Sequence, residues 1–528
     1  MKAHFKIFWS AGDADAQSVI EGAFADGLKE AIALQESAHR RVYSIGRAES
    51  QGCSPSPTSL VLKIHHTASG RHPFREGLKR RLGRSAARRE WRALESLHLN
   101  RIAVPRPRAW GRLPNGDEII VTDFIQGEGL KDAFDHASPE ERLRFVEKLA
   151  RTILALHATG YRHGDLHLGN LWVGEDGQIS LLDLERARSC WHSREPLVDL
   201  ARLELSLAKA GWKLSRRLTL RQLIGVDARF EGALRRFLRD YQRGRARRVL
   251  RVGRLWAKTR LGRLHGLRES SLSADALAKC FEATEADPCP RTRRDGRIRI
   301  TRTDADGRSI IVKRVAAGGF WRALADSLRG SSAARAFHAG QRLGLLCDRA
   351  AQPLAYLEER RFGLPIRSWL LVEEVGEVDL DQLIPETPAS AIRVAKALAE
   401  WLAEGHSWGL SHRDQKASNI RVRITPGSIR FWLIDLEDLT GPKKCEEDAR
   451  LLALSQLNAS LSDDAFGLDA RRAALDHYLA QAPGLIESGS AMSRIVQQSL
   501  ARQHRWRGHG CAFADSGSAP SPLIRREP

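Results

Sequence analysis

The sequence predicts an α+β protein with two tandem bilobal domains, each with a small β-rich lobe followed by a larger helical lobe. Two observations carry this prediction. A polar loop occurs twice, its shared residues offset by 249 positions, and an apolar strand with a single lysine occurs twice, offset by 250. The predicted strands and helices follow the same order around both copies. A chain of 528 residues has room for two such domains.

The repeated lysine lies in an apolar, strand-like run upstream of the polar loop in each half. Lys63 lies within the apolar run 60–64, and Lys313 ends the run 310–313. The chain has only 16 lysines against 69 arginines, so the same lysine in two buried strands is not expected by chance.

A helix is predicted after each lysine, because the chain repeats Ser-Ala-Ala-Arg from Ser85 and from Ser332. Serine is a favoured N-cap, so both serines are predicted to begin a helix. A second strand-like run follows over residues 118–125 and 369–375. These elements complete each β-rich lobe.

The polar loop lies between a helix and a strand. Amphipathic helices are predicted before its two copies, over residues 139–156 and 389–404. The positions that the copies share are His157 and His406, Gly160 and Gly409, His163 and His412, Asp165 and Asp414, and Asn170 and Asn419. A strand that ends in an acid follows each copy, at Asp183 and at Asp435.

These residue types are the ones that phosphoryl transfer requires: a cation for nucleotide phosphates, oxygen ligands for Mg²⁺, and a base near the acceptor hydroxyl. The strand lysine, the H-x-D-x-x-x-x-N loop and the strand-terminal Asp resemble the protein-kinase signature set. More narrowly, His163–Trp172 with Leu181–Arg186 resembles the lipopolysaccharide core kinase family, kinase-like enzymes that phosphorylate Kdo or heptose with ATP. The resemblance implies two protein-kinase-like domains in tandem.

For the nucleotide, the resemblance implies that Lys63 contacts the α/β-phosphates of ATP. Glu90 would hold Lys63 as an ion pair, with Glu95 as the competing candidate. The segment ending in Asp123 and Phe124 would line the adenine pocket through backbone groups.

For the transfer itself, the resemblance implies that Asp165 takes or orients the proton of the acceptor hydroxyl. Asn170 and Asp183 would bind Mg²⁺, with Mn²⁺ as an alternative. The matching residues of the second half are Lys313, Asp414, Asn419 and Asp435, together with Lys416, at a position where serine/threonine kinases place a phosphate-contacting lysine.

Both halves depart from the protein-kinase pattern. Neither has a Gly-x-Gly-x-x-Gly loop, so the phosphates must be covered differently. Aligning the Ser-Ala-Ala-Arg segments places Phe337 opposite Glu90, so the second half is expected to lack the ion pair that orders Lys313. Glu185 and Glu437 follow the metal-type Asp where kinases have glycine. They are interpreted either as acids that face solvent or pair with arginine, or as further metal ligands.

The leading functional hypothesis is therefore an ATP-dependent lipopolysaccharide core sugar kinase. The alternatives are a Ser/Thr protein kinase and a nucleotide-binding pseudokinase scaffold. The first domain is favoured as active, and the second is expected to be active or regulatory.

Net charge points to an anionic partner. The chain carries +21, which favours an anionic glycolipid such as lipopolysaccharide core, or the inner-membrane surface. Nucleic acid is disfavoured because no nucleic-acid-binding motif is present. The seven cysteines are scattered singly, which argues against disulfides and a zinc site. The absence of a long apolar run favours the cytoplasm, with peripheral binding at the inner membrane face.

The repeat also predicts domain boundaries. Residues 1–34 are assigned to an N-terminal extension, 35–270 to the first domain, 271–294 to a linker, 295–485 to the second domain, and 486–528 to a flexible tail.

Overall fold

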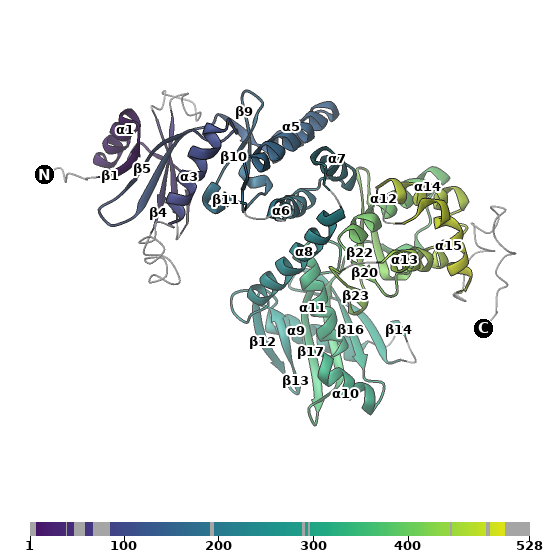
Figure 1. Cartoon of the computed structure of the whole chain (residues 1–528). Coiled ribbons are helices and arrows are strands. Elements are labelled where there is room, and N and C mark those ends of the chain that lie inside the picture. The colour runs from purple at the N-terminus through teal and green to yellow at the C-terminus, as the bar shows by residue number, and fades with distance from the viewer. Residues whose placement is uncertain are drawn as a thin grey trace. The chain divides into compact units, whose positions relative to one another are not determined.

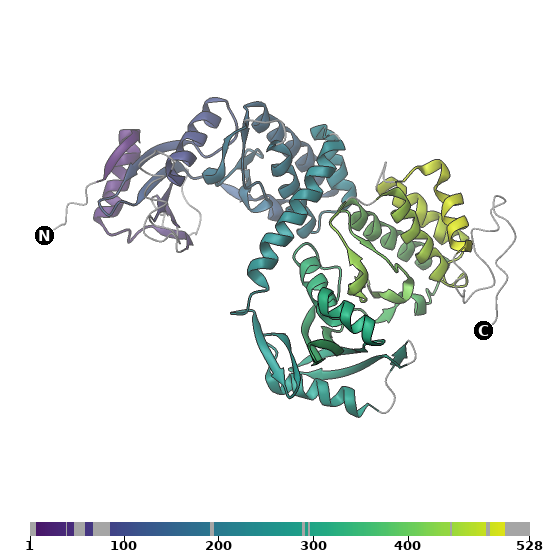
Figure 2. The same ribbon diagram turned by 60° about the horizontal axis from the view of Figure 1, so that its bottom comes forward.

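The computed structural model describes residues 7–37, 40–46, 59–66, 85–190, 195–226, 228–287, 291–293, 296–443, 446–481 and 486–501 (Figures 1 and 2). The chain forms two compact units, Met1–Leu234 and Arg235–Pro528. The boundary between them lies within helix α8 (Ala228–Val249). Each unit mixes a sheet-rich lobe with a helical lobe, so the predicted α+β class and tandem arrangement are confirmed.

The small lobe of the first unit consists of β1 (Phe8–Gly12), α1 (Ala14–Ala25), β2 (Ile32–Glu36), β3 (Arg40–Ile45), β4 (Leu60–His65), α3 (Ala86–Leu99), β5 (Pro107–Arg112) and β6 (Glu118–Asp123). Its six strands form one sheet in the order β1-β5-β6-β4-β3-β2.

The helical lobe of the first unit consists of β7 (Gly127–Gly129), α4 (Leu130–His136), α5 (Pro139–Ala158), β8 (Tyr161–Arg162), η1 (Leu168–Asn170), β9 (Leu171–Gly174), β10 (Ile179–Leu181), η2 (Leu184–Arg186), β11 (Arg188–Ser189), α6 (Glu195–Lys209) and α7 (Leu214–Ile224). The polar loop runs from the end of α5 through β8 to η1.

The small lobe of the second unit consists of β12 (Trp256–Leu261), β13 (Leu264–Glu269), α9 (Ala274–Ala286), β14 (Arg291–Arg293), β15 (Ile298–Ala305), β16 (Arg308–Ala316), α10 (Phe320–Arg329), α11 (Ser332–Gly344), β17 (Pro353–Arg361) and β18 (Leu364–Glu373). Its seven strands form a sheet in the order β12-β13-β17-β18-β16-β15-β14.

The helical lobe of the second unit consists of β19 (Val378–Asp379), η3 (Leu380–Gln382), α12 (Pro388–Ser407), β20 (Ser411–His412), η4 (Ala417–Asn419), β21 (Ile420–Thr425), β22 (Ser428–Leu433), η5 (Leu436–Asp438), β23 (Leu439–Thr440), α13 (Glu447–Ser460), α14 (Leu468–Gln481) and α15 (Ser488–Ala501).

The six strands of the first sheet have counterparts in the same order in the second, which adds β12. Lys63 of β4 lies opposite Ile120 of β6, and Lys313 of β16 lies opposite Leu370 of β18. β1 pairs with β5 at the edge of the first sheet, and β13 pairs with β17 at the corresponding position of the second, beside the edge strand β12. The segments that enter the sheets, β1-α1-β2 and β13-α9-β14, are therefore counterparts.

This equivalence moves the domain boundaries from where the sequence analysis placed them. The segments 1–34 and 271–294 were assigned to an extension and a linker. Instead, β1 pairs with β5 in the first sheet, and α1 contributes Ala16 and Ile20 to the core of the first small lobe. Helix α9 contributes Leu277 and Cys280 to the core of the second. Strands β12 and β13 belong to the second unit, not the first, because β13 pairs with β17. Part of the proposed tail forms α15, and residues 502–528 lie outside the described residues.

Alternation along the lysine strand determines where the lysine points. In β4, Leu60, Leu62 and Ile64 are buried in the same core cluster as α1. Successive side chains of a strand face opposite sides, so Lys63 points to the other face of the sheet. In β16, Ile310 and Val312 pack with α9 in the same way, which turns Lys313 to the opposite face.

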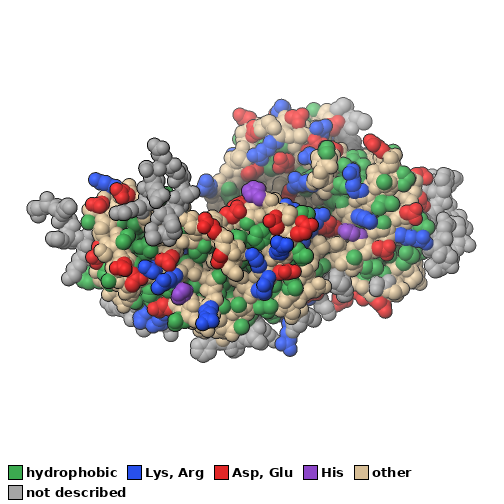
Figure 3. All heavy atoms as spheres, turned by 90° about the horizontal axis from the view of Figure 1, so that it is seen from above, with side chains coloured by type: hydrophobic (Ala, Val, Ile, Leu, Met, Phe, Trp, Pro, Cys, Tyr) green, Lys and Arg blue, Asp and Glu red, His purple; other side chains and the backbone are tan. Residues whose placement is uncertain are grey.

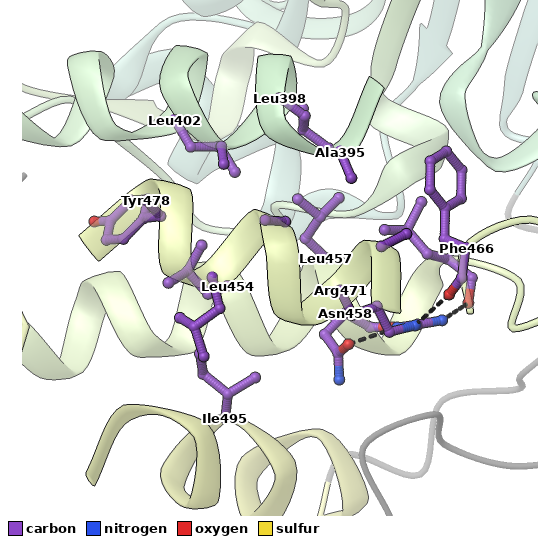
Figure 4. Close-up of a pocket in the computed structure, with 15 residues that line it drawn as sticks. Ala395, Leu398, Leu402, Leu454, Leu457, Asn458, Phe466, Arg471, Tyr478 and Ile495 are labelled. Atoms are coloured by element: carbon purple, nitrogen blue, oxygen red, sulfur yellow. Dashed lines mark hydrogen bonds between the residues drawn. The ribbon is translucent and has the colours of Figure 1, made fainter. Parts of the chain in front are cut away.

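The helical lobe of the second unit has an apolar cavity of about 80 Å³ between α12, α13, α14 and α15 (Figure 4). Leu398, Leu457 and Ile495 are among its lining residues. Arg471 lies at one end, and its guanidinium is held by hydrogen bonds to Asn458 and Phe466. The charge is thereby satisfied, and the cavity belongs to the core of this lobe.

Candidate active site

The polar loop has the same internal geometry in both units. The side-chain amide of Asn170 donates to the backbone carbonyl of Asp165 at 2.9 Å, and Asn419 donates to the carbonyl of Asp414 at 2.9 Å. A buried histidine ring at the start of each loop contacts a carbonyl near the strand-terminal Asp. His163 lies 2.9 Å from the carbonyl of Leu182, so this histidine braces the loop.

Lys63 and Glu90 form a buried ion pair in the first unit. Lys63 Nζ lies 2.5 Å from Glu90 Oε1, and His65 Nε2 lies 3.4 Å from the other carboxylate oxygen. Burial by itself would raise the pKa of Glu90, but the Lys63 ammonium and the contacts with His65 outweigh it and hold the pKa well below its ordinary value. The structure thus pairs Lys63 with Glu90, the first of the two expected candidates.

Asp183, an expected metal ligand, has an unforeseen partner. Arg40 of β3 donates to Asp183 at 2.7 Å and lies 3.7 Å from Glu185. Burial would lower the pKa of Arg40, but its hydrogen bond to Asp183 and the nearby carboxylates raise it. Asp183 itself has φ 59°, a left-handed conformation uncommon for a residue other than glycine. Glu185 thus takes the arginine-paired interpretation in this unit.

The lysine of the second unit pairs differently. Lys313 Nζ lies 2.6 Å from Asp435 and 3.2 Å from Glu437. The Ser332 hydroxyl donates to the other oxygen of Glu437 at 3.0 Å. Burial raises the pKa of Glu437, whereas Lys313 holds the pKa of Asp435 below its ordinary value despite burial. Lys313 thus pairs with the strand-terminal Asp435 instead of with an acid on the preceding helix.

Helix α11 explains why Lys313 has no partner like Glu90, although its residues align with those of α3 differently than the Ser-Ala-Ala-Arg segments suggest. Ser331, and not Ser332, caps this helix, because its hydroxyl accepts from the Ala334 amide. The buried positions of α3 and α11 then align so that Trp91 matches Phe337 and Glu90 matches Ala336. A buried alanine, rather than Phe337, stands where the first unit has its glutamate.

A second difference between the units concerns the position of Arg40. In the cross-strand register, Val42 lies opposite Lys63 and Ile300 lies opposite Lys313. The counterpart of Arg40 is therefore Ile298, which carries no charge. In the first unit, Arg40 neutralises the metal-type Asp and Glu90 holds the lysine. In the second unit, Lys313 forms ion pairs with both Asp435 and Glu437.

The second unit contains a cleft of about 320 Å³ that joins apolar walls to charged groups. Its lining includes Ile298, Ile311 and Leu370 and brings together the sequence-predicted set of this half, namely Lys313, Asp414, Lys416, Asn419 and Asp435. Such a cavity is of a size that holds a small ligand.

Two details within this cleft bear on phosphate and metal binding. Lys416 lies 2.7 Å from Asp414, and both side chains are partly exposed. Among the described residues, the buried Oδ1 atom of Asn419 has no hydrogen-bond partner. A hard cation takes oxygen ligands of this kind, so Asn419 and Asp435 fit a Mg²⁺ ion.

The predicted adenine-lining segment follows β6. The amide of Asp123 donates to the Arg106 carbonyl at 3.0 Å, and the amide of Phe124 donates to the Ser59 carbonyl at 2.9 Å. Both amides are thus used inside the small lobe and are not open to a base in this conformation. Glu374 of the second unit repeats the second bond, to Ser309.

Sequence reasoning missed the residues that anchor the loop from the helix behind it. On α6, Asp199 accepts the amides of His163 at 2.6 Å and Gly164 at 2.9 Å. Arg202, on the same helix, binds the Asp165 carboxylate at 2.5 Å. An acid or arginine within a surface-type helix gives no signal of its own, so these roles become visible only once the helix is placed.

The second unit anchors its loop with neutral side chains. Ser206 accepts the Leu168 amide and Ser460 accepts the Ala417 amide, which identifies these two serines as counterparts. On that basis Gln456 stands where the first unit has Arg202. Gln456 binds the Arg413 carbonyl at 2.7 Å. The partner of Asp414 is then Lys416, from the loop itself.

The bilobal fold, the strand lysine and the Asp–Asn loop define the protein-kinase-like class. Residues 29–222 and 281–473 each match the lipopolysaccharide kinase (Kdo/WaaP) family. The two matches span most of the chain and correspond to its two units, so the protein belongs to this family.

Two curated proteins are similar over shorter stretches. The KEOPS complex subunit Bud32 of Pyrococcus abyssi is 38% identical over 65 residues, covering 12% of this chain and 29% of that protein. The RIO-type serine/threonine-protein kinase Rio2 of Methanocaldococcus jannaschii is 29% identical over 147 residues, covering 25% of this chain and 52% of that protein. The chain thus spans about half or less of the length of these relatives.

Proposed function

We propose that the protein is an ATP-dependent kinase that transfers the γ-phosphate to a sugar hydroxyl, Kdo or heptose, of lipopolysaccharide core, and that the first unit carries the transfer site. The observation that carries this proposal is the Lys63–Glu90 pair at 2.5 Å in the unit that also has Asp165, Asn170 and Asp183. An ordered lysine of this kind is required for phosphoryl transfer in kinases.

Each residue is proposed to have one role in the transfer. Lys63 holds the α/β-phosphates while Glu90 keeps its ammonium in position. Asp165, oriented by Arg202, receives the proton of the acceptor hydroxyl. Mg²⁺ would be held by Asn170 and Asp183, and when bound it neutralises charge on the phosphates. Arg40 must move away from Asp183 before that carboxylate can serve the metal.

The second unit is proposed to bind nucleotide, either as a second catalytic site or as a regulatory one. Its cleft supports binding, because apolar walls and Lys313 are brought together there. The pairing of Lys313 with Asp435 supports a weaker site, since both groups must separate to serve phosphate and metal.

A Ser/Thr protein kinase is the second candidate. Lys416 beside Asp414 is the arrangement that favours it, together with the similarity to Rio2. In this reading the acceptor is a protein hydroxyl, and the second unit carries the transfer.

Labelled ATP distinguishes the two candidates. The full chain is incubated with purified lipopolysaccharide core and, separately, with a general protein acceptor. Asp165→Asn is expected to reduce transfer to the core by at least about a hundredfold, while the exposed-loop control Asp176→Asn has no effect. Transfer to core that persists in Asp165→Asn but is lost in Asp414→Asn would move the transfer site to the second unit. Transfer to protein alone would overturn the sugar-kinase proposal.

A further inference from the structure

Helix α10 of the second small lobe exposes an apolar face. The exposed fractions are 62% for Phe320, 78% for Trp321, 37% for Leu324 and 85% for Leu328. The rings of Phe320 and Trp321 contact each other edge to face, with centroids 5.5 Å apart. Large apolar side chains gathered on one short helix, rather than scattered singly, indicate a binding surface.

The spacing of these residues places them on one side of the helix. Positions 320, 324 and 328 follow one another at four-residue intervals, and 321 lies beside them, so the four share an arc of about 100°. Ala323 is buried, and α10 packs against β18 through that side. The apolar arc therefore lies off the packed side of the helix and is exposed. Figure 1 shows α10 at the lower end of the second small lobe.

Basic residues border this apolar arc. Arg322 and Arg329 are exposed on α10 itself, and the Arg297 guanidinium lies against Gly318 at the start of the helix. The acid of α10, Asp326, is bound by Arg335 of α11 at 2.7 Å. The helix thus presents arginines and an apolar stripe, while its negative charge is neutralised from behind.

We infer that α10 docks the protein on the surface of an anionic lipid bilayer, with Phe320, Trp321 and Leu328 in the headgroup region and the arginines on lipid phosphates. An apolar stripe with tryptophan on a basic-edged helix is the pattern of helices that lie in the interface. None of the helices that the structure describes has the length and apolar character to cross a bilayer.

The net charge of +21 favours an anionic lipid surface over a neutral one. The chain carries a net +21, yet on the face shown in Figure 3 the acidic and basic side chains of the described residues are intermingled. We therefore expect the net charge to attract the protein to an anionic bilayer, and α10 to determine which side of the protein contacts it. This inference deepens the proposed function and rests on it in one respect: the glycolipid acceptor would reside in such a surface.

Vesicle co-sedimentation of the full chain tests the inference without ATP or acceptor. Vesicles of phosphatidylcholine alone are compared with vesicles that also contain phosphatidylglycerol. The double variant Phe320→Ser/Trp321→Ser is expected to weaken binding to the anionic vesicles about tenfold or more. The matched control is Leu99→Ser/Ile384→Ser, which removes two side chains that are each 82% exposed elsewhere. The control is expected to bind like wild type.

Three results would overturn the inference. The variant could bind anionic vesicles as wild type does, or wild type could bind neither vesicle. A wild-type dimer in light scattering that the variant converts to a monomer, with no vesicle binding, would assign the face to a second copy of the chain. Transfer to a water-soluble core fragment, measured in parallel, reports on the proposed function separately, and the α10 variant is expected to retain it.

Discussion

At the scale of single residues, the two strand lysines occupy equivalent positions but form ion pairs with different partners. Lys63 and Lys313 occupy the same register in equivalent strands. One lies 2.5 Å from a helix carboxylate, and the other lies 2.6 Å from the metal-type Asp. The difference follows from two neighbours, since the second unit has Ala336 where Glu90 stands and Ile298 where Arg40 stands.

Removing Arg40 tests this competition. Arg40→Ala is expected to lower the Mg²⁺ concentration for half-maximal transfer about tenfold, because a charge-assisted bond to Asp183 no longer has to be broken. The measurement uses the Asp414→Asn background, so that only the first unit contributes. Arg41→Ala is the control, since Arg41 is exposed and pairs with Glu36. An unchanged or higher Mg²⁺ requirement would show that Arg40 does not compete with the metal.

The second residue-scale prediction concerns pH and His406. This histidine is fully buried against the Tyr478 hydroxyl, and burial, with help from Arg450 and Arg349, lowers its pKa to about 3. In the unfolded chain it binds a proton below its ordinary value of 6.5. The unfolded state therefore holds more protons as pH falls from 6.5 toward 3, and the free energy of unfolding decreases in that window.

Urea titration at pH 7 and pH 5 measures this effect. Wild type is expected to lose about 2 kcal/mol more than His406→Gln between the two pH values. His265→Gln, at an exposed histidine of the same unit, is the control and should follow wild type. Equal pH dependence of wild type and His406→Gln would mean that His406 is not the group that titrates.

Much of the candidate site could be predicted at this scale, and the limits have a physical cause. The loop residues, the lysines and the strand-terminal acids recur with fixed spacing, so each half of the sequence supports the prediction made for the other. Arg40, Asp199 and Arg202 have no such signal, because each reaches the site from an element far along the chain. The sequence aligns Phe337 with Glu90 because Ser331 and Ser332 are both acceptable N-caps, and only the buried face of α11 decides between them.

At the scale of elements, α6 and α13 brace the loops by different chemistry. Asp199 and Arg202 use charge, whereas Gln456, at the position of Arg202, uses neutral hydrogen bonds. A buried arginine on the following helix, α7 or α14, binds each of these two helices. Arg217 binds Glu204 at 2.5 Å, and Arg471 binds Asn458 at 2.5 Å.

These arginines are expected to stabilise their own units. Arg217→Met and Arg471→Met should each cost about 3–5 kcal/mol, because removal of one partner leaves buried polar groups without compensation. Thermal unfolding of each variant measures the cost. Arg472→Met is the control, since that neighbour is only half-buried. A loss below about 1 kcal/mol would mean that the site relaxes or admits water.

The element order could be read from the sequence, but the edges of the sheets could not. The lysine strands, the helices before the loops and the acid-terminated strands were all expected. The strands β1, β12 and β13 were not expected. β1 and β13 pair with strands far along the chain, β5 and β17, and β12 is an edge strand that joins the sheet through β13. The alternation in β13 becomes interpretable only once it pairs with β17.

At the scale of the whole molecule, a duplicated fold raises the question of how many nucleotides it binds. Each unit supplies a lysine, an Asp–Asn loop and a strand-terminal Asp, and the second adds a cleft of about 320 Å³. Calorimetric titration of the full chain with a non-hydrolysable ATP analogue and Mg²⁺ is therefore expected to give two sites.

Lys63→Met should remove one site and Lys313→Met the other, because each lysine contacts only the phosphates bound in its own unit. The second unit should bind more weakly, since Lys313 must first leave Asp435 and Glu437. Lys258→Met, at an exposed lysine of β12, should leave both sites intact. A single site that Lys313→Met does not affect would show that the second unit keeps the fold without binding nucleotide.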